Sequence, residues 1–163
     1  MATSPATLPD PPDIAEVKRR LAGRSRPEHF YVALLGLRTY QPIRIYAQLQ
    51  KGLGYTAFER FQRNTGLSAA ALAELIQLPA RTLARRKEAG RLLPDESDRL
   101  MRAARVFGRA LELFEGEPEA ARHWLTSKQP LLGNLVPLDL SSTDLGARAV
   151  EQLVGRLGHG IPA

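Results

Sequence analysis

The stretch LAELIQLPARTLARR, residues 72–86, has an apolar first half and a cationic second half, and the fold can be worked out from it. In the first half Leu72, Leu75 and Ile76 fall on one side of a helix, because residues three and four apart share a helix face. Ser68 stands at the start of this alanine-rich segment, where its side-chain oxygen can accept a hydrogen bond from a free backbone amide. The sequence therefore predicts a helix over residues 68–76.

A second helix is predicted over residues 79–88, after a turn at Gln77 and Leu78. Pro79 suits the first turn of a helix because its missing amide hydrogen is not needed there, and Gly90 suits the end. Another helix, residues 56–64, is expected before the pair, since Thr56 and Glu59 form a capping-box pattern. Three short helices thus follow one another closely.

The remainder of the chain is also predicted to be helical. Further helices are expected over residues 14–23, 43–52 and 95–115, from Pro118 through Trp124 and Leu125, and from a capping box of Ser141 and Asp144 to Gly158. In the helix 43–52 four residues stand at helical spacing, Ile43, Tyr46, Ala47 and Gln50. In the last helix an apolar face is predicted, formed by Leu145, Ala149, Leu153 and Leu157. No strand pattern and no internal repeat is found, so we predict an all-α fold, with the conformation of residues 28–42 left open.

The composition excludes several classes of protein. Of the 163 residues 44% are hydrophobic and 25% charged, an ordinary globular composition, and no cysteine is present for disulfides or thiolate metal sites. The first residues have neither the charged nor the apolar region of a leader, and no apolar run approaches the ~20 residues of a membrane-spanning helix. We therefore expect a cytoplasmic protein with no membrane association, and a disordered, proline-rich arm over residues 1–13.

The net charge of +6 is unevenly distributed along the chain. Residues 1–109 hold 19 Lys/Arg and 10 Asp/Glu, whereas residues 110–163 hold 4 and 7. A basic field attracts polyanions such as nucleic acid, and an acidic region suits a cationic protein partner. Simple solubility is the alternative interpretation.

The helices around the opening stretch resemble the Xre/Cro-type helix-turn-helix. In that resemblance Ala73 is the small residue where two helices cross closely, and Leu72, Ile76, Leu78 and Leu83 are core. The predicted DNA-binding residues are the outward side chains of the second helix, Arg81, Thr82, Arg85, Arg86 and Lys87. An arginine on such a helix can donate two hydrogen bonds to guanine while other cations neutralise phosphates. Gln77 replaces the usual glycine of the turn, so a residue with a Cβ atom is expected to make the turn at a small cost in strain, and Pro79 replaces the usual capping serine. A helix pair with a merely solvated arginine face is the alternative.

A single helix-turn-helix binds weakly, so we expect a homodimer that reads two half-sites of operator DNA. The helix 95–115 has an apolar stripe that could serve for dimerisation or could be ordinary core: Leu100, Ala104, Phe107, Leu111 and Phe114.

Residues 121–160 are similar to the toxin-binding domain of the Xre/MbcA/ParS antitoxin family. The positions that carry the similarity are Ala121, Trp124, Leu125, Pro130, Leu132, Gly133, Asn134, Pro137, Leu138, Asp139, Leu140, Gly146, Val150, Leu153, Leu157 and Gly160. The resemblance implies an antitoxin that neutralises a NAD-depleting RES-domain toxin and represses its own operon. The expected toxin-binding residues are Trp124, Leu132, Gly133, Asn134, Pro137, Asp139, Gly158, His159 and Gly160. Core packing is the alternative role for Trp124, backbone geometry for Gly133 and Gly146.

Together these interpretations predict a helical DNA-binding domain over residues 14–94, a long connecting helix over 95–116 and a toxin-binding domain over 117–163. Catalysis is not expected, because the three histidines are widely separated in sequence and no cysteine nucleophile or phosphate-binding glycine motif is present. No cofactor and no metal is predicted. Two other functions stay open: a stand-alone transcriptional regulator with a dimerising or ligand-sensing C-terminal third, and an interaction module without DNA affinity.

Overall fold

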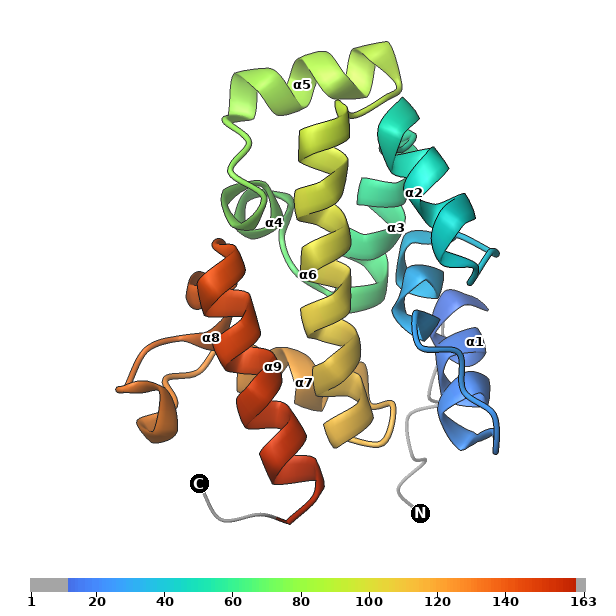
Figure 1. Ribbon diagram of the computed structural model, residues 1–163. Helices are drawn as coiled ribbons and strands as arrows, with labels where there is room; N and C mark the ends of the chain where they lie inside the picture. The colour runs from blue at the N-terminus through green and yellow to red at the C-terminus, as the bar shows by residue number, and fades with distance from the viewer. Residues whose placement is uncertain (1–11, 161–163) are drawn as a thin grey trace, which may run out of the picture.

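The computed structural model describes residues 12–160, and these residues form a single helical body (Figure 1). In chain order its elements are α1 (Pro12–Ala22), the 3-10 helix η1 (Phe30–Leu35), α2 (Pro42–Lys51), α3 (Tyr55–Thr65), α4 (Ala69–Leu75), α5 (Ala80–Ala89), α6 (Pro94–Leu113), α7 (Pro118–Leu125), the 3-10 helix η2 (Pro130–Leu132), α8 (Pro137–Leu140) and α9 (Asp144–Gly158). Within residues 12–160 the only extended pairings are two isolated bridges, Gly54 with Arg91 and Gln129 with Leu135. The predicted all-α fold is confirmed. No helix among these residues is long and apolar enough to cross a membrane.

Helix α6 runs through the middle of the molecule and the other helices pack around it (Figure 1). Leu100, Ala104, Phe107 and Leu111 are each 0–1% exposed, and Phe114, the last residue of the predicted apolar stripe, is partly buried against the core. The stripe is therefore covered by the chain itself. Burying a leucine or phenylalanine side chain stabilises the fold by about 1.5–3 kcal/mol, and this stripe is therefore a large part of the core. It leaves no free surface for a second copy of the chain.

The segment 28–42, whose structure the sequence left open, contains η1. All six residues of η1 are buried, and it packs against α1, α3 and α6. Gly108 of α6 allows the close approach, since a Cβ atom there would lie 2.5 Å from the Cβ atom of Tyr31. The N-terminal part of the chain thus belongs to the same core as the helix-turn-helix.

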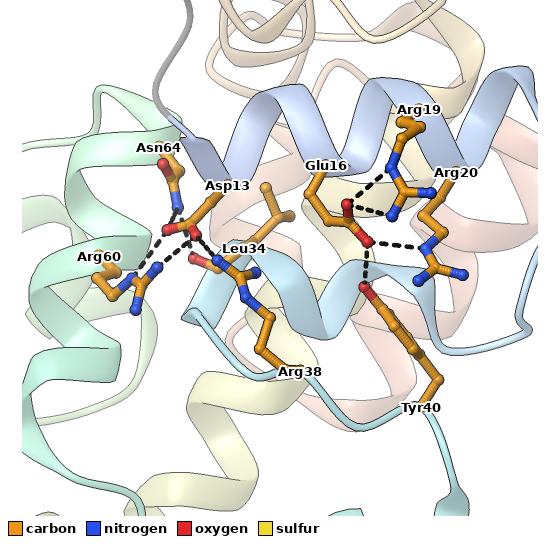
Figure 2. A network of polar contacts seen from close by, with 9 residues as sticks. All are labelled: Asp13, Glu16, Arg19, Arg20, Leu34, Arg38, Tyr40, Arg60 and Asn64. Atoms are coloured by element: carbon orange, nitrogen blue, oxygen red, sulfur yellow. Dashed lines mark hydrogen bonds and ion pairs between the residues drawn. The ribbon is translucent and has the colours of Figure 1, made fainter.

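Helix α1 is tied to α3 by a buried carboxylate (Figure 2). Asp13 is 3% exposed and accepts hydrogen bonds from Arg60, Asn64 and Arg38. Burial acts to raise the pKa of Asp13, but these hydrogen bonds outweigh it and leave the pKa below its ordinary value. The sequence predicts a disordered arm over residues 1–13, but Pro12 and Asp13 already belong to α1. Residues 1–11 lie outside the described residues.

One turn further along α1, Glu16 lies among two arginines and a tyrosine (Figure 2). Arg19 and Arg20 donate to its carboxylate and lower its pKa to about 2, and the Tyr40 hydroxyl donates a third bond of 3.0 Å. Arg20 also lies 4.5 Å from the centre of the Tyr40 ring. Through Tyr40 this cluster fixes the segment between η1 and α2.

Two predicted capping boxes are wrong. Helix α3 begins at Tyr55 rather than at Thr56, and its first amide donates to the carbonyl of Gly90, 2.9 Å away. The backbone after α5 thus takes the place of the side-chain cap. At α9 the cap is Thr143, whose hydroxyl accepts from the amide of Gly146, while Ser141 is buried and donates to the carbonyl of Pro137.

The predicted apolar face of the last helix is also wrong. Leu145 is 82% and Leu157 37% exposed, and Ala149 is exposed as well, whereas Leu153 is buried as predicted. The buried face consists of Gly146, Ala147, Val150, Leu153 and Val154. The helix turns its small residues inward because a Cβ atom on Gly146 would lie 1.9 Å from the carbonyl oxygen of Leu140. Close backbone approach, rather than leucine content, decides which face is buried.

Candidate functional site

Helices α4 and α5 form the predicted helix-turn-helix. Ser68 caps α4 by accepting a hydrogen bond from the amide of Ala71, 3.0 Å away. The amide of Leu78 donates to the carbonyl of Ala73 at 2.8 Å, which closes the turn. Gln77 has a φ of 56°, in the left-handed region that costs a residue with a Cβ atom about 1–2 kcal/mol. The strain expected from a missing turn glycine is thus present.

The recognition helix α5 lies on the surface, and no residue in it is buried. Only Leu83 and two other residues of the helix reach partial burial, and Leu83 packs against the core. Arg81, Arg85 and Lys87 are exposed, and the guanidinium of Arg85 lies 3.5 Å from the hydroxyl of Thr82. Figure 1 shows α5 lying across one end of the molecule, where its outer side is open. Such a surface suits insertion into a DNA groove.

Arg86 differs from the other predicted DNA-binding residues. Its guanidinium donates three hydrogen bonds of 2.8–3.0 Å to the carboxylate of Glu96, with 18% and 5% of the two side chains exposed. The same carboxylate accepts from the amide of Leu93 and so caps α6. Burial acts to raise the pKa of Glu96, but the hydrogen bonds from Arg86 and Leu93 outweigh it, and the pKa lies below its ordinary value. The outward placement predicted for Arg86 is therefore corrected: its side chain fastens α5 to α6.

The turn of the helix-turn-helix also contacts α6 and the C-terminal third. Arg99 of α6 donates to the carbonyl of Ile76 at 2.6 Å. The side-chain amide of Gln77 and the guanidinium of Arg102 each lie 3.4 Å from the carbonyl oxygen of Ser142. A cavity of about 250 Å³ opens at this junction, between Glu74 and Gln77 on one side and Asp139 on the other. The two predicted functional regions are thus in direct contact.

In the C-terminal third, residues 127–136 form a compact loop beside α7 and α9. Gln129 and Leu135 pair as an isolated bridge, and the Gln129 side chain donates to the carbonyl of Trp124 at 3.0 Å. Gly133 and Asn134 turn the chain with φ values of 66° and 60°. Glycine and asparagine are the residues that adopt this left-handed conformation most readily. The Gly133–Asn134 pair therefore sets the shape of the loop.

The structure divides the predicted toxin-binding residues into two groups. Trp124 and Leu132 are partly buried and pack against the core, and Pro137 is buried at the start of α8. The other predicted residues are exposed: Gly133, Asn134, Asp139, Gly158, His159 and Gly160. The first group shapes the surface and the second group is accessible to a partner.

Three leucines of this region that are more than half exposed were not among the predicted toxin-binding residues. Leu131 is 54%, Leu135 53% and Leu145 82% exposed. Leu131 and Leu135 flank the Gly133–Asn134 turn, and Leu145 lies in the first turn of α9. No local signal in the sequence marked Leu131, because neighbouring residues of a 3-10 helix can all be buried, as the six residues of η1 are.

The comparisons with known proteins agree with this arrangement. The profile of the Antitoxin Xre-like helix-turn-helix domain matches residues 44–105, and that of the Antitoxin Xre/MbcA/ParS C-terminal toxin-binding domain matches residues 109–160. The first match contains α4 and α5, and the second contains α7, η2, α8 and α9. Fold and sequence together define a helix-turn-helix protein with a second, toxin-binding domain.

Curated relatives specify the family further. Antitoxin Xre of Photorhabdus laumondii is 32% identical over 118 residues, which cover 71% of this chain and 78% of that protein. Antitoxin Xre of Yersinia enterocolitica is 40% identical over 85 residues, covering 52% and 57%, and that of Pseudomonas putida is 34% identical over 84 residues, covering 51% and 52%. The match thus spans about half the length of the latter two relatives. The chain belongs to the Antitoxin Xre family.

Proposed function

We propose that the chain neutralises a RES-domain toxin that depletes NAD, and that it represses its own operon by binding operator DNA as a homodimer in the cytoplasm. The observation that carries this proposal is the position of two open surfaces on one core. One is the cationic outer side of α5, and the other is the leucine-bearing surface around the Gly133–Asn134 turn and α9.

For DNA, the proposed contacts are Arg81, Arg85 and Lys87, with Thr82 beside them. Arg81 and Arg85 are four residues apart and so lie one helical turn apart on the same side of α5. The guanidinium group offers paired donors to a phosphate or to a guanine edge, and Lys87 offers a single charge to phosphate. Arg86 contributes by holding the helix in place.

For the toxin, the proposed contacts are Leu131 and Leu135 with the exposed polar residues Asn134 and Asp139. Exposed leucines grouped on one surface typically mark a protein-binding site. The end of α9, with Gly158, His159 and Gly160, is a second proposed contact, because its residues are exposed beyond the last buried position, Val154. An exposed helix end that projects beyond its core contacts can reach into a partner's cleft.

We propose further that the chain acts by binding alone. His29 lies 2.8 Å from the hydroxyl of Tyr31, while His123 and His159 are exposed on α7 and after α9. Among residues 12–160 no group of three His, Cys, Asp or Glu side chains is placed to hold a metal ion. A general base needs a nucleophile that a substrate can reach, and Tyr31, the hydroxyl beside His29, is buried with only 5% exposed.

The experiment is to express the neighbouring gene product with and without this chain, to measure cellular NAD, and then to co-purify the pair. We expect NAD to collapse with the neighbour alone and to recover when the two co-purify. The double variant Leu131→Asp/Leu135→Asp should lose protection, whereas Arg81→Ala/Arg85→Ala should keep protection and bind DNA more weakly. Full protection by the leucine variant would contradict the assigned toxin surface.

A further inference from the structure

A cavity of about 350 Å³ opens between the C-terminal halves of α6 and α9 and the segment between α1 and η1. Its lining is apolar at Leu113 and Val154 and charged at Arg26, Arg109 and Glu112. Figure 1 shows the C-terminal ends of α6 and α9 at the end of the molecule opposite α5. A group bound in this cavity would therefore leave the proposed DNA-binding surface open.

Arg26 and Arg109 are both held over a buried aromatic ring. Their guanidinium carbons lie 5.3 and 6.0 Å from the centre of the ring of Phe30, which is 0% exposed. Both arginines also pair with the carboxylate of Glu112, Arg109 at 3.3 Å. About a third of each arginine side chain is exposed, 35% and 31%. The two guanidinium groups are thus fixed in position and remain accessible.

The charged groups of the cavity leave an excess of hydrogen-bond donors. A guanidinium carries several N–H groups, and Glu112 is a single carboxylate shared by two of them. Glu151, which also lines the cavity, accepts a hydrogen bond of 2.6 Å from Arg105. Three arginines therefore face two carboxylates, and the spare donors suit a further carboxylate.

Two glycines of α9 keep the cavity open. Gly155 and Gly158 both line it, and a Cβ atom built on either would meet nothing within 4 Å. Glycine weakens the interior of a helix relative to alanine, and no close contact within residues 12–160 requires it at Gly155. The missing side chains leave room for a group that comes from another molecule.

We propose that this cavity binds an aspartate or glutamate side chain of the toxin, with Arg26 and Arg109 donating to its carboxylate. This inference rests on the proposed neutralisation of the toxin. The cavity adjoins the proposed toxin contact at the end of α9, since Gly158 and His159 belong to both. Guanidinium groups match the two oxygens of a carboxylate, and the apolar part of the lining reduces the screening of this contact by water.

Arg26 lies before both segments that match the family, residues 44–105 and 109–160. Its role therefore follows from the fold, which brings it to Glu112 of α6, and not from the family resemblance. The acidic excess of residues 110–163 favours a cationic partner, but Arg26 and Arg109 come from outside that range. At this cavity they reverse the expectation and favour an anionic group.

The test measures the affinity of the purified chain for the purified product of the neighbouring gene, the toxin of the proposed function. Arg26→Glu should weaken binding by at least about tenfold, because the bound carboxylate loses one partner and meets a like charge. The control Arg24→Glu makes the same charge change at an exposed residue of the same segment outside the cavity, and should stay within about twofold. Wild-type affinity in Arg26→Glu, or equal weakening in both variants, overturns the proposal.

Charge reversal in the toxin identifies the carboxylate. Each aspartate and glutamate of the toxin is replaced in turn by lysine, and each toxin variant is tested for binding to Arg26→Glu. One of them should restore the affinity to within about tenfold of the wild-type pair, because its lysine meets the new glutamate. A merely structural role of Arg26 gives no such rescue, so the absence of any rescuing variant overturns the proposal.

A second variant fills the cavity and leaves its charges unchanged. Gly155→Leu should weaken toxin binding by at least about tenfold through steric exclusion, while its melting temperature stays at or above the wild-type value. The control Ala149→Leu adds similar bulk at an exposed position of α9 outside the cavity and should bind as the wild type does. Unchanged affinity in Gly155→Leu overturns the proposal.

The failure of this inference differs from the failure of the proposed function. If the toxin binds the wild type and both cavity variants equally, the cavity is not part of the interface and the neutralisation stands. If the neighbouring product does not bind the wild type, the proposed function and this inference are both overturned. If Arg26→Glu loses toxin binding together with its melting temperature, Gly155→Leu decides, because it leaves Arg26 and Glu112 paired.

Discussion

Replacing Glu96 by glutamine tests whether Arg86 positions the recognition helix or reads DNA. The Glu96 side chain is 5% exposed and accepts three hydrogen bonds from Arg86 and one from the amide of Leu93. Because α5 has no buried residue, this ion pair and the partly buried Leu83 are its main attachments to the body. Glutamine has nearly the same shape but no charge, so it keeps the packing and weakens the attachment.

The magnitude follows from the burial of the pair. Removing one partner of a buried ion pair costs about 3–5 kcal/mol, and a hydrogen bond to a charged group contributes about 1.5–3 kcal/mol. Arg86 keeps 18% of its side chain exposed, so water can partly solvate it after the change. We therefore expect Glu96→Gln to lower the free energy of unfolding by about 2–3 kcal/mol, the lower part of these ranges. For a chain of this length that corresponds to a fall in Tm of about 4–12 °C.

Thermal unfolding and salt-dependent DNA binding separate the two roles of Arg86. Glu96→Gln and Arg86→Ala should lower Tm together and weaken DNA binding without changing the slope of log affinity against log salt, since neither removes a group that touches phosphate. The control Arg81→Ala should keep its Tm and lower the slope by about 0.9 for each phosphate that the side chain neutralises. An Arg86→Ala variant with wild-type Tm and a reduced salt slope would refute the reasoning.

Three further changes test other contacts. Asp13→Asn leaves Arg60 and Arg38 without their carboxylate; because these arginines keep 34% and 54% of their side chains exposed, it should destabilise by about 2–3 kcal/mol. Because the pKa of Asp13 is lowered in the folded state, its contribution is present above the ordinary value of 3.8 and is lost as pH falls through the folded pKa. The urea midpoint of the wild type should thus fall between about pH 6 and about pH 3 more than that of Asp13→Asn, and parallel curves would contradict the assignment. Gln77→Gly removes the strain of a left-handed residue but adds conformational freedom to the unfolded chain, so its effect on stability should lie between zero and a gain of about 1 kcal/mol. If a urea titration shows a loss of stability instead, the 3.4 Å contact between the Gln77 side chain and Ser142 contributes more than the strain costs. Gly146→Ala would place a Cβ atom 1.9 Å from the carbonyl oxygen of Leu140 and should destabilise α9, whereas Gly155→Ala, with nothing within 4 Å, should stabilise it by about 0.5–1 kcal/mol. Equal melting temperatures of these two variants would contradict the close approach at Gly146.

The helix-turn-helix could be predicted because its signals are local. Ser68 begins α4 and Gly90 ends α5 through contacts within a few residues, and the turn between the two helices is closed by hydrogen bonds from Gln77 to Glu74 and from Leu78 to Ala73. Such contacts form wherever these residue types occur in this order. The exposure of Arg81 and Arg85 follows from the same helical spacing.

The errors arise where contacts are distant in sequence. Arg86 is spaced like a surface residue of α5, but Glu96 lies ten positions further on, and only the fold brings them together. Helix α9 offers two overlapping apolar faces, and leucine hydrophobicity favours the wrong one, because the choice is made by the backbone of Leu140 against Gly146. The burial of η1 likewise depends on Gly108 of α6, far along the chain.

Part of the uneven charge along the sequence is neutralised by ion pairs within the fold. Arg99, Arg102 and Arg105 lie along one side of α6, where Arg99 donates to the Ile76 carbonyl, Arg102 lies 4.0 Å from Asp144 and Arg105 lies 2.6 Å from Glu151. Basic residues of the first two thirds thus pair with acidic residues of the last third, so neither count measures the charge offered to a partner. On α5 the exposed cations are Arg81, Arg85 and Lys87.

Because the cations of α6 are paired within the fold, we expect the salt dependence of DNA binding to come from the exposed cations of α5. With three phosphate contacts in each of two copies, the slope of log affinity against log salt should be about −5, since each contact contributes about −0.9. Footprinted DNA with two half-sites and a range of chloride concentrations measures it directly. A slope near −5 that falls to about −2 in Arg81→Ala/Arg85→Ala supports α5 as the DNA-binding element, because only Lys87 of each copy then remains in contact. A much steeper slope would mean that cations outside α5, such as Arg44 and Lys51 on α2, also reach the phosphates.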